Sequence, residues 1–194
     1  MSLAGVCKCA LLMLVVLGMS GCNAVGTASP SGTSTTAGAA PVSSPPVGIS
    51  GFEYKYIPDG RIHMNLCKTP ACVPGSKVSY TFFGPVANPD IEEYTNAQNS
   101  TVSALRARAP EGATIRLEKV EQSRDLGVTV FTSSREIRSP DGLMEFTKST
   151  LVFYNDRTIS LISSSEEKEA AESNGALFLM GLMVRSETSR NSGM

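Results

Sequence analysis

The chain has 194 residues, the length of one domain rather than two, and its 17 basic and 18 acidic side chains nearly cancel. Because binding to nucleic acid needs a concentrated positive face, we expect no nucleic-acid partner. With 41% hydrophobic and 18% charged residues the chain can form a core, so it is not disordered throughout. The charges are distributed unevenly, since Lys8 is the only charged residue before position 51.

Residues 1–21 have the pattern of an export signal. Lys8 supplies a positive start, Ala10–Leu17 is an apolar run, and two small residues precede Cys22. The apolar run is about half of the roughly 20 residues that a transmembrane helix needs. The pattern therefore favours a cleaved signal peptide over a membrane-spanning anchor.

The segment at positions 19–22, Met-Ser-Gly-Cys, resembles the lipobox of bacterial lipoproteins, with Met where Leu is usual. The resemblance implies that the signal is removed and that Cys22 receives acyl chains such as palmitate, and two or more chains anchor a protein stably to a membrane. Cys7 and Cys9 would leave with the signal. The resemblance implies a lipid-anchored protein of the cell envelope. Asn23 is not the Asp associated with inner-membrane retention, which favours the outer membrane, facing the periplasm, over the inner membrane.

Residues 23–50 are mostly small or hydroxyl-bearing, with several prolines and no charged or aromatic side chain. Such a segment cannot bury enough apolar surface to offset the entropy lost on ordering. A flexible chain of this length has a coil dimension of about 30 Å. We therefore expect residues 22–50 to be the lipidated cysteine and a disordered tether, and residues 51–194 to form a single domain.

The charged part of the chain alternates between strand and helix patterns. Alternating runs rich in Val, Ile, Thr and Phe are separated by short turn-forming segments, which predicts antiparallel pairing of consecutive strands. Asp90 and Ser100 are candidate N-caps of one helix, and overlapping Ser-x-x-Glu capping boxes over 163–167 predict the start of another. In chain order we expect strands over 52–57, 61–66 and 77–83, a helix from 90 to about 110, strands over 114–120, 127–138, 143–154 and 158–163, and a helix over 166–185.

This order predicts an α+β fold in which helices cover a mainly antiparallel sheet, made of a hairpin plus strand, a helix, a four-stranded meander and a C-terminal helix. The last strand, over 158–163, its turn rich in Ser and Glu, and the helix over 166–184 resemble the PsbP-type fold. That fold occurs in some bacterial lipoproteins and in an extrinsic photosystem subunit. The resemblance implies a binding or assembly domain rather than a catalyst, although a fold does not establish a function.

Cys67 and Cys72 are the other cysteines with a chemical interpretation. In an exported protein, two cysteines around a turn that contains proline predict a disulfide. Closing so short a loop stabilises the fold by about 2 kcal/mol on the chain-entropy argument. A metal site would have to add His63 and Met64, and a single His with two Cys does not complete a four-ligand zinc site. We expect a disulfide here, with no metal and no cofactor.

The chain carries few residues for catalysis. Any Ser-His-Asp or Cys-His system would depend on His63, and no G-x-S-x-G segment is present. We therefore expect no catalytic residues. A small-ligand carrier or an enzyme with a pocket near His63 or near the arginines stays open as an alternative. These arginines are Arg106, Arg108, Arg116, Arg135 and Arg138.

Residues 176–184 are apolar on every side of the predicted helix, although a helix on one sheet needs a single apolar stripe. Either the helix is buried on more than one side, or the apolar side chains that do not pack on the sheet form a docking face for a protein partner in the envelope. Outward-facing Leu179 and Met183 would then be central, and flexible Met side chains would suit such a face. The residues of this candidate partner surface are Leu177, Phe178, Leu179, Met180, Leu182 and Met183. The function we expect is a membrane-anchored envelope lipoprotein with a non-catalytic binding or assembly domain.

Overall fold

The computed structural model describes residues 47–59, 61–68, 70–154 and 157–191, with side chains described as far as Val184. The predicted signal peptide, Cys22 and most of the predicted tether lie outside these residues. So do position 60 and positions 155–156, which belong to two predicted turns. No helix in the described ranges is long and apolar enough to span a membrane.

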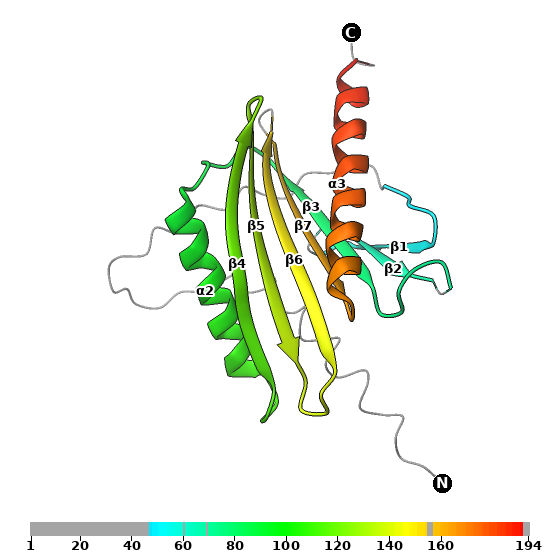
Figure 1. Cartoon of the computed structure of the whole chain (residues 1–194). Helices are drawn as coiled ribbons and strands as arrows, with labels where there is room; N and C mark the ends of the chain where they lie inside the picture. Colours follow the sequence, from blue (N-terminus) through cyan, green and yellow to red (C-terminus); the bar gives the residue numbers. More distant parts are fainter. Residues whose placement is uncertain (1–46, 60, 69, 155–156, 192–194) are drawn as a thin grey trace.

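In the described part of the chain, seven strands form one antiparallel sheet and two helices pack against it (Figure 1). The spatial order of the strands is β1-β2-β3-β7-β6-β5-β4, so β7 pairs with β3 and joins the predicted hairpin plus strand to the meander. This confirms an α+β fold with an antiparallel sheet. The elements are β1 (Phe52–Ile57), β2 (Ile62–Cys67), β3 (Lys77–Phe83), α2 (Ile91–Arg108), β4 (Thr114–Asp125), β5 (Val128–Arg138), β6 (Met144–Tyr154), β7 (Arg157–Ser165) and α3 (Lys168–Asn191).

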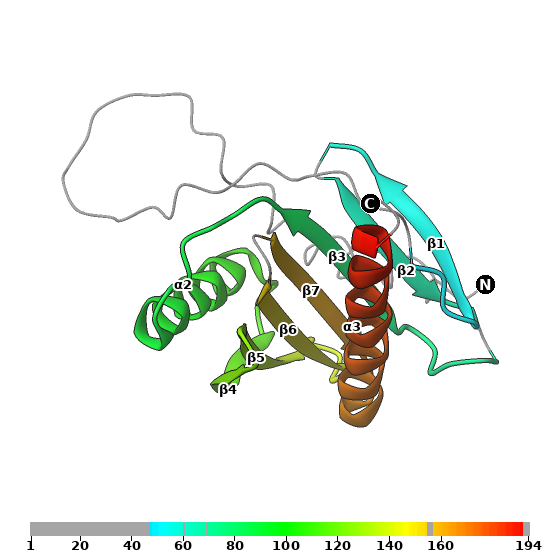
Figure 2. The same ribbon diagram turned by 90° about the horizontal axis from the view of Figure 1, so that it is seen from above.

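The two helices lie on opposite faces of the sheet, as the view from above shows (Figure 2). α3 contacts β7, β6 and β3, whereas α2 contacts β4 and β5. Because strand side chains alternate between the faces, each face has its own core. Under α2 the buried residues are Val102, Leu105, Ile115 and Ile137. Under α3 they are Val47, Val78, Tyr80, Phe82, Val152, Ile159, Leu161, Phe178 and Leu182. We call the two sides of the sheet the α2 face and the α3 face.

The start of α2 is fixed by a capping box. The Asp90 side chain accepts the Glu93 backbone N–H at 2.8 Å, and the Glu93 carboxylate accepts the Asp90 N–H at 3.2 Å. Asp90 is thus the N-cap, and Ser100, the other candidate, lies inside the helix. Two donors that a helix start would leave unpaired are satisfied in this way.

The predicted start of α3 is wrong. β7 continues through Ser165, so residues 163–165 are strand rather than helix caps, and α3 begins at Lys168 and ends at Asn191 instead of near 185. The backbone of these serines pairs with β3 on one side and with β6 on the other, which competes successfully with a cap. Only Ser165 keeps a capping contact, since its hydroxyl accepts the Glu167 N–H at 3.2 Å.

The packed part of the chain includes residues 47–50, which the composition assigns to the tether. Val47 is buried in the core under α3, and its N–H donates to the Tyr80 hydroxyl at 2.7 Å. A Cβ added at Gly181 of α3 would lie 3.0 Å from Val47 Cγ1, so the helix and this segment approach closely where the helix has no side chain. The tether therefore joins the domain beside α3.

Candidate functional site

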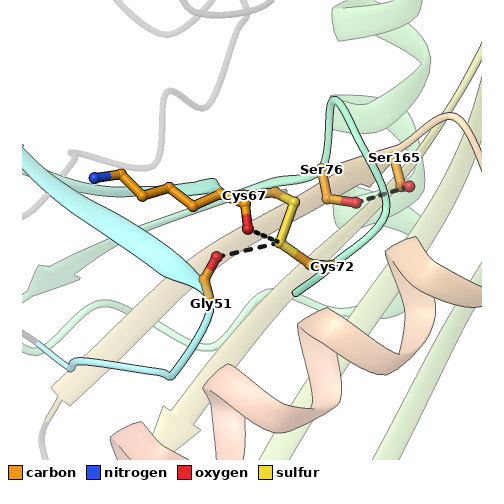
Figure 3. The surroundings of a disulfide bond; sticks show 6 residues. Gly51, Cys67, Cys72, Ser76 and Ser165 are labelled. Carbon is orange, nitrogen blue, oxygen red and sulfur yellow. Dashed lines mark hydrogen bonds between the residues drawn. A yellow bond between two sulfur atoms is a disulfide. The ribbon is translucent and has the colours of Figure 1, made fainter. Parts of the chain in front are cut away.

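The predicted disulfide between Cys67 and Cys72 is present, with the Cα atoms 5.8 Å apart (Figure 3). Cys72 Sγ lies 3.2 Å from the Gly51 carbonyl oxygen, a close contact rather than a hydrogen bond because a disulfide sulfur carries no proton. The same carbonyl accepts the Lys68 N–H at 2.8 Å. Gly51 has φ +86°, and a Cβ there would lie 2.8 Å from the Ala71 Cβ. The disulfide thus closes the loop that follows β2 and holds it against Gly51, the residue before β1, which is a structural role.

His63 is buried on the α3 face among aromatic rings. Its ring stacks on Tyr80 with the centroids 4.7 Å apart, and Nδ1 lies 3.0 Å from the Tyr54 hydroxyl. Tyr56 flanks the ring, with its centroid 5.2 Å away. Burial lowers the pKa of His63, which favours the neutral ring. These contacts are those of a packed strand histidine. Within the described residues no group of three or more His, Cys, Asp or Glu side chains could hold a metal ion.

The candidate partner surface needs correction, because the helix is turned differently about its axis. Phe178 and Leu182 are fully buried in the core and are no part of any surface. Leu179 and Met183, expected to face outward, are half-buried and pack against that core. Up to Val184, where the described side chains end, the large apolar residues exposed on the helix are Leu177, Met180 and Val184, with 42%, 60% and 64% of their surface exposed.

We call these three residues the α3 strip. Their spacing of three and four places them on one side of the helix. The sequence contained a signal for the correct orientation, because Gly175 and Gly181 mark the side of close approach. A Cβ at Gly175 would lie 3.3 Å from the Ser163 Cβ, and Gly181 contacts Val47. Val184 was missed because the apolar run was treated as uniform.

The five arginines named as candidates for a ligand pocket do not gather at one site. Arg106 donates to the Ile115 carbonyl at 2.8 Å, and exposed Arg116 pairs with Glu136 at 3.1 Å. Arg138 Nε lies 3.2 Å from the Met144 sulfur, and Arg108 stands in the last turn of α2. Of the arginines whose side chains are described, Arg135 is the buried one, with 6% of its surface exposed.

Arg135 begins a line of polar residues across four neighbouring strands on the α2 face. It lies opposite Thr147 of β6, Thr147 lies opposite Ser164 of β7, and Ser164 lies opposite Lys77 of β3. Directly opposed side chains have their Cβ atoms about 4.5–5.5 Å apart. We call these four residues the polar row. Only 2% of Thr147 and 1% of Ser164 is exposed.

An ion pair closes one end of the polar row. Lys77 Nζ lies 3.0 Å from Glu145 Oε1, and these side chains are 12% and 18% exposed. Glu145 belongs to β6 and Lys77 to β3, so the pair spans β7, which lies between them and carries Ser164. At the other end, Arg135 Nη2 donates to the Ser149 hydroxyl at 3.0 Å. Burial lowers the pKa of Arg135, and the nearby Tyr94 and Glu145 side chains oppose this.

Three buried atoms of the polar row have no hydrogen-bond partner in the described part of the chain. They are Arg135 Nε, Thr147 Oγ1 and Ser164 Oγ, on three consecutive strands. Leaving a buried polar group unpaired costs about 1–3 kcal/mol. The sequence singles out Arg135 only as one of five arginines near a possible pocket, and it does not single out either hydroxyl. The sequence does contain one sign of buried hydroxyls. The serine run at the end of β7 gives neither face of the sheet an apolar residue there.

No protein-family model matches the chain, and no curated protein matches it. Among solved structures it is similar to cyanobacterial PsbP (CyanoP) from Synechocystis, with 10% identity over 73% of this chain and 95% of that chain and a TM-score of 0.42. It is also similar to PA94 from Pseudomonas aeruginosa, described as a protein of unknown function and putative regulator, with 7% identity over 60% and 83% of the two chains and a TM-score of 0.33. Both TM-scores are below 0.5, so we draw no functional conclusion from either.

Proposed function

We propose that the chain is a lipoprotein of the bacterial cell envelope, held on the outer membrane by acyl chains on Cys22, whose folded domain binds a protein partner without catalysis. The signal pattern and the lipobox resemblance support the anchor. The observation that carries the binding role is the α3 strip, Leu177, Met180 and Val184.

The α3 strip is surplus to the fold. Phe178 and Leu182, on the other side of the helix, already fill the core under α3. Apolar residues exposed singly are ordinary, whereas several on one side of one helix are typical of an interaction surface. Met180, the central residue of the strip, has a flexible thioether chain that adapts to a partner's shape.

The position of the tether suggests what kind of partner reaches the strip. Val47 contacts Gly181, which lies beside Met180 in α3, so the tether enters the domain at this helix. The predicted tether has a typical coil dimension of about 30 Å, which sets the usual distance between that helix and the anchoring membrane. A protein attached to the same membrane is therefore the partner that the proposal specifies.

The test is photo-crosslinking in cells, with the full-length chain carrying a photo-reactive amino acid in place of Met180. We expect a crosslinked adduct with a membrane protein that Leu177→Asp abolishes and that the exposed, same-helix control Glu172→Lys preserves. Cys22→Ser is expected to abolish lipid labelling and to weaken the adduct, because the partner lies at the membrane. The proposal is refuted if Met180 yields no more adduct than position 172, or if Leu177→Asp acts only by unfolding the domain.

A further inference from the structure

The polar row has a feature that partner docking on α3 does not explain: buried hydrogen-bonding groups that point to a missing acceptor. On the α2 face, Arg135, Thr147 and Ser164 stand side by side on β5, β6 and β7. Arg135 Nε–H can only donate, and each hydroxyl can donate one hydrogen. Three adjacent donors without partners match a group that offers several acceptor oxygens.

We propose that the polar row is a binding site for a small oxyanion, a carboxylate or phosphate group, held by the Arg135 guanidinium and by the hydroxyls of Thr147 and Ser164. The site lies on the face of the sheet opposite α3 and is distinct from the proposed docking of a protein partner. No catalytic step is involved.

The charge balance of the row favours an anion over a cation. Lys77 and Arg135 carry two positive charges, and Glu145, which lies near both, carries one negative charge, so one positive charge of this group has no paired ion. The Arg135 hydrogen bond goes to Ser149, a neutral hydroxyl. A buried charge without a paired ion is costly, and a bound oxyanion converts it into a hydrogen-bonded pair.

The shape of the guanidinium fits the same ligand. Arginine grips carboxylate and phosphate groups side-on through parallel N–H donors. In Arg135 the Nη2 edge is already oriented by Ser149, while Nε on the same edge is unpaired. The side chain is thus held in place with a donor available.

Solvent reaches the row at its Lys77 end. The side chains of Lys77 and Glu145 are 12% and 18% exposed, whereas those of Thr147 and Ser164 are almost completely covered. Lysine has a long flexible side chain, and its ammonium group can turn from Glu145 toward an incoming anion. The ion pair is therefore the entrance to the site.

The test is thermal unfolding of the full-length chain in detergent with inorganic phosphate or acetate, at constant ionic strength held by sodium chloride. A ligand that binds the folded state raises the unfolding midpoint with its concentration. We expect a saturable rise with phosphate or with acetate, and the stronger response identifies the group recognised. An equal response to phosphate, acetate and chloride overturns the proposal.

Two serine variants separate an anion site from a merely unpaired hydroxyl. Ser164→Ala removes a donor of the row and should weaken the apparent anion affinity at least tenfold. Ser163→Ala is the matched control, because its buried hydroxyl is also unpaired but lies one residue away on the α3 face. We expect Ser163→Ala to leave the anion response unchanged. If the two variants respond alike, ordered water rather than an anion satisfies these groups and the proposal fails.

Discussion

The two faces of the sheet differ in the side chains that they bury. On the α3 face, Ile159 and Leu161 of β7 are fully buried with Phe178 and Leu182 of α3 in a continuous apolar core. The same strand gives the α2 face Ser164, beside Arg135 and Thr147. Since neighbouring residues of a strand point to opposite faces, β7 supplies both from a single run of nine residues.

The difference teaches where to look for stability and where to look for binding. The α3 face pairs some of its buried polar residues, such as His63 with Tyr54 and Ser76 with Ser165, but leaves the Asn65 amide and the Ser163 hydroxyl unpaired. The α2 face differs because its unpaired groups include a charged guanidinium, and they stand on three consecutive strands in one row. A fold tolerates unpaired groups at a functional site when the rest of the structure supplies enough stability. The apolar face is thus the support and the polar face is the candidate site.

The largest expected effect comes from the centre of the α3 core. Phe178 is completely buried and meets the Phe52 ring edge-on with the centroids 5.2 Å apart. Phe178→Ala should lower the free energy of unfolding by about 3–5 kcal/mol, because it removes the burial and leaves a cavity. Chemical denaturation of the full-length chain measures this.

The control for that variant is Met180→Ala, two residues away on the exposed side of the helix. A surface substitution of this kind usually changes stability by less than about 0.5 kcal/mol. Equal losses from the two variants would show that α3 does not sit on the sheet through Phe178.

A smaller effect is expected from loss of the disulfide between Cys67 and Cys72, which lies near the edge of the sheet. Replacing Cys67 and Cys72 together by Ser should lower the free energy of unfolding by about 2 kcal/mol, because the unfolded chain regains the entropy of an open loop. The comparison is with the wild-type chain under reducing conditions, which should unfold at the same denaturant concentration as the double variant. A reduced protein as stable as the oxidised one would contradict this.

The sequence was a good guide to the order of elements, because alternation and turns are local signals. The expected strand over 77–83 matches β3 at both ends. Two features of the fold depend on residues far apart in the sequence. The start of α3 was decided by the pairing of Ser163–Ser165 with β3 and β6, and the pairing of β3 with β7 joins residues about 80 positions apart in sequence. Only the Lys77 end of the polar row depends on that pairing, whereas Arg135, Thr147 and Ser164 meet through the register of consecutive meander strands, which the spacing of turns does not specify.

The smallest expected effect is the response of His63 to pH. It tests whether the α3 face has only a structural role. Burial lowers its pKa below the ordinary value of 6.5, so the unfolded chain binds a proton more readily than the folded one. Stability contributed by the neutral ring is present above pH 6.5 and is lost as the pH falls below it. The groups that face the ring, Tyr54, Tyr56 and Tyr80, are neutral in this range and supply no compensating negative charge.

Denaturation of the wild type between pH 7.5 and about 5.5 should therefore show a decline in stability that His63→Gln removes. His63 is the only histidine in the chain, so no other side chain with an ordinary pKa titrates in that range. A decline that persists in the variant would place the titrating group elsewhere and contradict the prediction. The pH response thus reports whether the responsive charge lies on the α3 face.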